Sequence, residues 1–241
     1  MPAKAPMALT PELIARVART EPDRGFPPGA LHQTDEDHHN MVEGLLAQHR
    51  PRELWLFAYG SLIWKPEFEQ TGNARATAHG WHRSFCLRIR RWRGTAAFPG
   101  LMMALDRGGC CQGVAYRLPD DNHAAQLHRL VRRETTMKPA TNVPRWIDIR
   151  CEGGEQRKAL AMTADPRGPA YTGKLELAEV ARILARAAGH WGSGAEYLFN
   201  TVHHLDQFGI RDRNLWLLQD LVAKEIEGLA SGVHAGHTPP E

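Results

Sequence analysis

Residues 57–64 read Phe-Ala-Tyr-Gly-Ser-Leu-Ile-Trp, and they mark a point where an apolar strand runs into a glycine. The continuous apolar run Leu54–Tyr59 predicts a buried strand. Gly60 allows a sharp turn and a close approach to a ligand, and successive N–H groups in such a turn can bind an anion. A plain strand-ending turn is the alternative, because Gly-Ser turns are common. Gly60 directly precedes Ser61, so the G-x-S-x-G elbow of serine hydrolases is not met.

Outward from this stretch, strands dominate the middle of the chain and helices the end. Further strands are predicted at Ser84–Ile89, Leu101–Leu105, Gln112–Leu118, Ile147–Ile149 and Lys158–Thr163. Helical spacing of apolar residues predicts helices over Asp121–Glu134, Leu175–Ala188 and Tyr197–Phe208, and a further helix from an Asp212 cap. Ser193 and Glu196 have the spacing of a capping box before the third of these helices. This order favours the α+β class.

The two ends of the chain differ in composition from its middle. Residues 1–50 are rich in proline and polar side chains, and we expect an N-terminal extension with partial order and short helices at Pro11–Arg19 and Asn40–Gln48. Residues 51–227 are expected to form one domain. Residues 228–241 are rich in glycine, proline and histidine, which is typical of a flexible tail.

Composition excludes several functional classes. The net charge of +3 is too small to favour nucleic acid or an anionic membrane as a partner. One basic run, Arg88–Arg93, resembles a nucleic-acid surface, but a solvated strand end is the favoured interpretation. No apolar run is long enough to span a membrane, the first residues lack a secretory signal, and the four cysteines show no CxxC spacing. We therefore expect a cytoplasmic protein without nucleic-acid or membrane partners.

Glu134 is the carboxylate with the most suggestive position. Leu127, Leu130, Val131 and Glu134 fall on one face of the expected helix, so the carboxylate points with the apolar side chains. Desolvation there would raise its pKa and make it a plausible general base near neutral pH. The alternative is a structural ion pair with a neighbouring arginine at position 129, 132, 133 or 145.

Metal and cysteine chemistry have weaker support. The 13 histidines include doublets at positions 38–39 and 203–204, but adjacent residues of a helix point to different faces. HExxH and zinc-type Cys/His spacings are missing from the sequence, and no histidine is placed beside a cysteine. We expect no metal and no cofactor.

Taken together, the motifs resemble those of the ChaC-type γ-glutamylcyclotransferases. Tyr59–Leu62 is similar to the YGSL signature of that family, and Glu134 follows at the family's spacing. The other matching segments, in chain order, are Arg93–Thr95, Pro99–Gly100, Gly113–Leu118, Arg132–Glu134, Pro144–Trp146 and Glu196–Thr201. The similarity spans roughly residues 53–222 and leaves the first 50 residues outside.

The resemblance implies a small mixed β-barrel flanked by helices. It further implies a lyase-type enzyme that cleaves glutathione to 5-oxoproline and cysteinylglycine by attack of the substrate's own α-amine. Glu134 would be the catalytic acid/base, and the substrate-binding residues would be Tyr59, Gly60, Ser61, Leu62 and Tyr197. Other γ-glutamyl compounds as substrates, or a non-catalytic binding relative, are the alternatives. Residues 135–140 differ from the Gly/Tyr-containing stretch that often follows the glutamate in the family, and this difference concerns the loop's contacts with the cysteinylglycine half. A basic residue, Arg88 or Arg93, would bind a remote carboxylate of the substrate.

Overall fold

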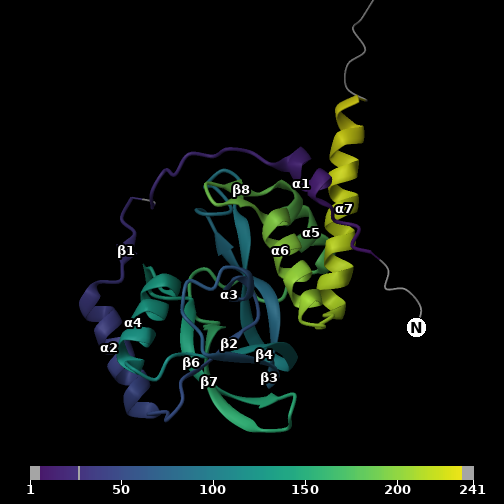
Figure 1. Ribbon diagram of the computed structural model, residues 1–241. Helices are drawn as coiled ribbons and strands as arrows, with labels where there is room; N and C mark the ends of the chain where they lie inside the picture. Colours follow the sequence, from purple (N-terminus) through teal and green to yellow (C-terminus); the bar gives the residue numbers. More distant parts are fainter. Residues whose placement is uncertain (1–5, 27, 235–241) are drawn as a thin grey trace, which may run out of the picture.

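The computed structural model of the chain describes residues 6–26 and 28–234, with a closed five-stranded β-barrel at its centre. The strands follow one another around the barrel as β2 (Trp55–Ala58), β4 (Gly100–Arg117), β3 (Gly72–Ile89), β6 (Asn142–Cys151) and β7 (Gln156–Ala164). Neighbours are antiparallel except where β7 meets β2 and β4 in parallel, so the barrel is mixed. The predicted α+β class is confirmed, with helices flanking the barrel in Figure 1.

The two longest strands were underestimated from the sequence. β3 and β4 each span 18 residues and pair along most of their length, whereas the sequence predicted only short pieces of them. The first half of β3 reads Gly-Asn-Ala-Arg-Ala-Thr-Ala-His, where small side chains occupy the buried positions. An apolar pattern search does not recognise such a strand, because alanine is depleted in strands. Bulges between His79 and Trp81 and between Ser84 and Leu87 interrupt the alternation further.

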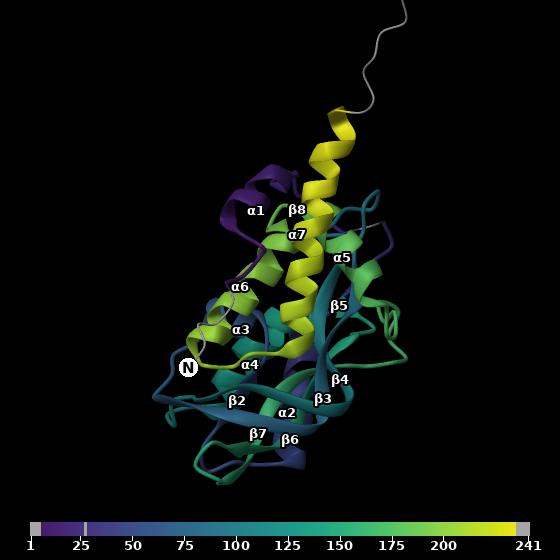
Figure 2. The same cartoon turned by 90° about the vertical axis from the view of Figure 1, so that its right-hand side faces the viewer.

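The predicted helices are present near their expected bounds. They are α4 (His123–Glu134), α5 (Leu177–Arg186), α6 (Gly194–Gln207) and α7 (Arg213–His234), and the short α3 (Ser61–Trp64) follows β2. Asp212 caps α7 by accepting the Leu215 N–H at 3.1 Å. The Ser193–Glu196 box is only half formed: Ser193 accepts the Glu196 N–H, but the Glu196 carboxylate pairs with Arg93 instead. Helices α5, α6 and α7 pack together beside the barrel (Figures 1 and 2).

The N-terminal segment contains more regular structure than its composition indicated. Helix α1 (Pro11–Val17) packs on α7, and α2 (Asp35–Gln48) packs on α4. A capping box between Thr34 and Asp37 starts α2 five residues before the predicted helix. Two-residue strands β1 (Leu31–His32) and β5 (Met137–Lys138) pair with each other, as do β8 (Ala188–Gly189) and β9 (Gly192–Ser193). At the other end, α7 continues past Gly228, and residues 235–241 of the expected tail lie outside the described residues.

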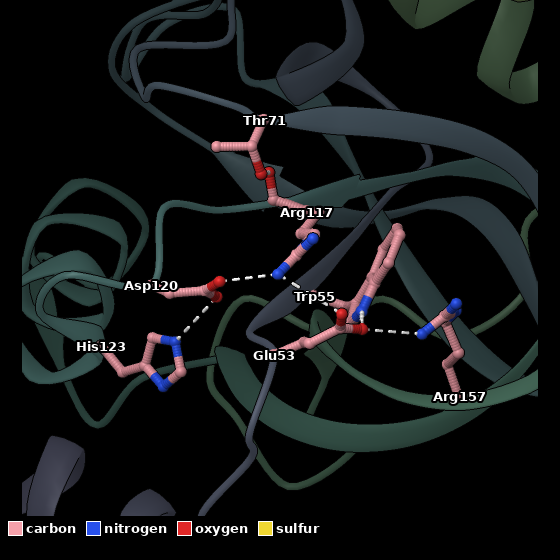
Figure 3. Close-up of polar contacts among 7 residues, drawn as sticks. All are labelled: Glu53, Trp55, Thr71, Arg117, Asp120, His123 and Arg157. Atoms are coloured by element: carbon pink, nitrogen blue, oxygen red, sulfur yellow. Dashed lines mark hydrogen bonds and ion pairs between the residues drawn. The ribbon is translucent and has the colours of Figure 1, made fainter.

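A network of charged side chains fixes the entrance to β2 (Figure 3). Glu53 accepts hydrogen bonds from Arg157 at 2.9 Å and from the Trp55 indole at 3.2 Å, and its other oxygen lies 3.3 Å from Arg117. Arg117 also donates to Asp120, ahead of α4. The network therefore links the start of β2 to the end of β4, to the start of β7 and to the α4 region. The catalytic candidates lie at the other ends of β2 and α4.

Candidate active site

A cavity of about 790 Å³ lies where β2 passes into α3. Its walls come from the Tyr59–Leu62 turn, the end of β3, residues 133–142 after α4, and Tyr197 of α6. The sequence-predicted site residues, scattered over 139 positions of the chain, all line this one space. Its charged lining comprises seven cationic side chains and two carboxylates. Such a lining is complementary to an anionic ligand.

The glycine of the turn is required by close packing. A Cβ atom at Gly60 would lie 2.9 Å from the Tyr197 hydroxyl oxygen and 3.7 Å from the Met103 sulfur. Tyr59 is buried beside it, and its hydroxyl donates to the Met162 carbonyl at 2.7 Å. The chain then turns directly into α3, where the Ile63 N–H bonds to the Gly60 carbonyl at 2.9 Å. The turn is thus held against both the barrel wall and α6.

Glu134 is the last residue of α4, and its side chain is 17% exposed. Burial raises its pKa above the ordinary value of 4.5, against the opposing effect of the Arg133 cation, and the Glu67 charge raises it further. The Arg133 Nε lies 3.0 Å from the Glu134 carboxylate. The structural alternative, pairing with an arginine, is therefore also present, but desolvation outweighs the pairing.

Tyr197 connects the turn to Glu134. Its ring packs edge-on against Trp64 and Phe85, and its hydroxyl lies beside the Gly60–Ser61 turn. Burial, and then the nearby Glu134 charge, raise the pKa of Tyr197 to about 12. The hydroxyl therefore stays protonated at neutral pH and is available as a hydrogen-bond donor.

The two arginines near the end of β3 differ in whether their side chains are available to bind a ligand. Arg93 is buried, and it donates to the Ser193 carbonyl at 2.9 Å and to Glu196 at 2.7 Å. Arg88 is exposed and lines the cavity, and its side chain has no ion pair or hydrogen bond within the described part of the chain. Of the two arginines considered from sequence for a remote carboxylate, Arg88 fits and Arg93 is already engaged.

Some cavity residues were not found from the sequence. Phe26, Trp92 and Trp191 line the cavity, together with residues 135–140, the loop that the resemblance had already related to the cysteinylglycine half. Phe26 belongs to the N-terminal segment, and its contact with Trp92, at 5.8 Å between ring centroids, bridges 66 positions. No local pattern encodes such a contact. Among residues 6–26 and 28–234, no group of three or more His, Cys, Asp or Glu side chains could hold a metal ion.

Comparison with known proteins identifies the family. A family model described as ChaC-like protein matches residues 54–225. The chain belongs to the ChaC-like family. The resemblance stated from the sequence motifs is confirmed, and every sequence-predicted site residue lies inside the ChaC-like match. The N-terminal segment before residue 54 lies outside it.

Relatives of this ChaC-like chain include proteins named as glutathione-specific gamma-glutamylcyclotransferases. The glutathione-specific gamma-glutamylcyclotransferase of Escherichia coli K12 is 40% identical, over 69% of this chain and 72% of the relative. The human glutathione-specific gamma-glutamylcyclotransferase 1 is 30% identical, over 71% and 79%. The crystal structure of a gamma-glutamyl cyclotransferase specific to glutathione from yeast has a TM-score of 0.65 at 21% identity, covering 73% of this chain and 97% of that one. This structural likeness supports the barrel fold.

Proposed function

We propose that this ChaC-like chain is a γ-glutamylcyclotransferase that converts glutathione to 5-oxoproline and cysteinylglycine. The observation that carries the proposal is the position of Glu134, a desolvated carboxylate with a raised pKa in the same cavity as the Gly60–Ser61 turn. The names of the E. coli and human relatives support glutathione as the substrate. Among the described helices, none combines the length and apolar character that crossing a membrane requires.

In the proposed reaction, the substrate supplies its own nucleophile. The α-amine of the γ-glutamyl group attacks the γ-carbonyl carbon, which closes a five-membered ring. Holding the chain in a near-attack shape replaces a bimolecular step with an intramolecular one. A new C–N bond forms, the amide C–N bond to the cysteine breaks, and no cofactor or external reactant is needed.

Glu134 moves the proton that this exchange requires. The amine is mostly protonated at neutral pH, and Glu134 accepts one of its protons before the attack and delivers it to the departing cysteine nitrogen. The further proton that the attacking nitrogen carries after ring closure also passes through Glu134 to that nitrogen, so cysteinylglycine leaves with a protonated amine. A carboxyl whose pKa lies above 4.5 performs both transfers more readily near neutral pH than an ordinary glutamate.

The turn and Tyr197 bind and orient the γ-glutamyl group in this proposal. Tyr59, Gly60, Ser61 and Leu62 bring backbone N–H groups to the cavity, and Tyr197 adds a protonated hydroxyl beside Ser61. Donors of this kind stabilise a carboxylate or the oxyanion that develops on the γ-carbonyl. At the other end of the substrate, exposed Arg88 binds the carboxylate of the glycine residue.

The direct test is to incubate the pure protein with glutathione and to assay for 5-oxoproline and cysteinylglycine. A parallel reaction uses glutathione acetylated on the α-amine, which cannot cyclise. We expect both products from glutathione and none from the acetylated substrate. Release of acetylglutamate would show hydrolysis instead, and failure to turn over glutathione would refute the substrate assignment. Other γ-glutamyl amines, tested alongside, define the substrate range.

A further inference from the structure

The cavity wall that follows Glu134 is held by the N-terminal segment. Three consecutive carbonyl oxygens, those of Thr135, Thr136 and Met137, each have a partner on residue 33 or 38. The Gln33 main-chain N–H donates to Thr136 at 3.1 Å, and its side-chain amide donates to Met137 at 3.0 Å. The His38 Nε2 lies 2.8 Å from the Thr135 carbonyl oxygen.

The histidine contact is a buried one. His38 is 5% exposed, and its Nδ1 is buried without a hydrogen-bond partner in the described structure. The tautomer that carries its proton on Nε2 donates to Thr135 and leaves Nδ1 uncharged. Thr135 is itself buried, and without His38 its carbonyl would lose a donor that a buried acceptor needs.

Further contacts tie the same two segments together. Strand β1 pairs with β5, so Leu31 and His32 lie opposite Lys138 and Met137. The Lys138 ammonium forms an ion pair with Asp37, next to His38. Residues 135–138 all line the cavity, directly after Glu134 in the chain. The wall beyond the catalytic carboxylate is therefore built on contacts with residues 31–38.

The N-terminal segment also reaches the cavity at a second point. Phe26 lines it, and the Arg91 guanidinium lies 4.0 Å from the centre of the Phe26 ring. Asp23 binds Arg91 through both carboxylate oxygens, at 2.9 and 2.6 Å. Figure 1 shows the segment leaving α1 beside α7 and reaching β1 and α2 on the other side of the barrel. It thus contacts the cavity lining at Arg91 as well as at residues 135–138.

We propose that Gln33 and His38 are positioning residues of the active site, although they lie outside the ChaC-like match at residues 54–225. They hold residues 135–138 in the arrangement that receives the leaving half of the substrate. The inference rests on the proposed function for its kinetic consequence. The structural part, that these donors fix the loop, stands independently of any substrate.

The test compares two matched substitutions. Gln33→Met keeps the side-chain length but removes the donor to Met137. Gln219→Met, the control, removes the acceptor of the Leu9 N–H, a 2.8 Å bond that holds the same N-terminal segment on α7. Hydrogen–deuterium exchange of peptides covering residues 135–141 is measured in the full chain, and kcat and KM are measured with glutathione.

We expect Gln33→Met to speed exchange in residues 135–141 and to raise KM by about 2- to 13-fold, the effect of one lost neutral hydrogen bond. The Gln219→Met control should leave both unchanged. His38→Gln, which retains an N–H donor, should disturb the loop less than His38→Leu. Unchanged exchange would overturn the inference, as would faster exchange without a rise in KM. If wild type fails to turn over glutathione, the proposed function fails, and exchange still decides whether Gln33 fixes the loop.

Discussion

Glu53 and Glu134 both lie beside arginines, at opposite ends of β2 and α4, but their surroundings differ. The Glu53 side chain is 39% exposed and is shared between Arg117 and Arg157, with the Trp55 indole as a third donor (Figure 3). The Glu134 side chain is 17% exposed, and its one cationic partner among the described residues is Arg133. Burial raises the pKa of Glu134 in spite of that partner.

The comparison teaches that an adjacent arginine does not by itself define the role of a carboxylate. Glu53 accepts from the side chains of two arginines and a tryptophan, and it is not part of the cavity lining that includes Glu134. Glu134 lines a cavity together with Tyr197 and the Gly60–Ser61 turn, where a substrate can reach it. The first arrangement stabilises the fold, and the second leaves a proton-transfer group available.

Glu134→Gln should reduce activity more than any other substitution at the Glu134 site or in the Glu53 network. The substitution keeps the size of the side chain and removes the base. We expect kcat for glutathione to fall at least about 100-fold, the scale of general acid–base catalysis. Circular dichroism checks that the fold is retained. A well-folded variant with near-wild-type turnover would refute the role of Glu134.

Gly60→Val moves the groups around Glu134 without touching the carboxylate. The new side chain collides with the Tyr197 hydroxyl, which lies 2.9 Å from the position of the first added carbon. Overpacking strain is typically about 1–3 kcal/mol, and we expect a roughly 5- to 160-fold loss of kcat/KM, which is the loss when strain of that size raises the activation barrier. Steady-state kinetics with glutathione give the result. Activity equal to wild type would show that the close contact is unimportant.

Ser61→Ala should have a smaller effect. In the proposed mechanism the serine hydroxyl contributes at most one neutral hydrogen bond, and the main chain of the turn is unchanged by the substitution. We expect kcat/KM to fall about 2- to 13-fold. As a control, wild-type enzyme is quenched during turnover of glutathione, and mass spectrometry measures whether it carries a covalent adduct. A loss as large as that of Glu134→Gln, with a γ-glutamyl adduct on Ser61, would indicate a covalent mechanism.

Glu53→Gln should change activity least. The partly exposed network contributes at most about 1 kcal/mol to the free energy of unfolding. We expect a slightly lower denaturant midpoint and kcat/KM close to wild type. A loss of activity comparable to that of Glu134→Gln, in a folded protein, would remove the distinction between the two carboxylates.

Much of the fold could be predicted from the sequence, where apolar periodicity was strong. The stripe of Leu127, Leu130 and Val131 located α4, and the apolar run before Gly60 located β2. The first half of β3 was missed because its buried positions are alanines. The closure of the barrel depends on pairings such as Leu56 with Leu160, which no local pattern reports.

The site was only partly predictable. Glu134, Tyr197 and the Tyr59–Leu62 turn were named from motifs and share one cavity. The engagement of Arg93 by Glu196 could not be predicted, because Glu196 fitted a capping role equally well. The contacts of Gln33 with residues 136 and 137 join segments about 100 positions apart. Such contacts depend on tertiary packing, and the spacing of residues in the sequence does not predict them.

The pH dependence of kcat/KM for glutathione tests the role of Glu134 most directly, because it reports the essential acid and base of the free enzyme. Glu134 acts as a base when deprotonated, and burial raises its pKa above 4.5, so activity should fall on acidification while the pH is still above 4.5. Circular dichroism at each pH confirms that the protein remains folded. The account expects an acidic limb with an apparent pKa above 4.5. A folded enzyme whose kcat/KM stays constant down to pH 4.5 would contradict it.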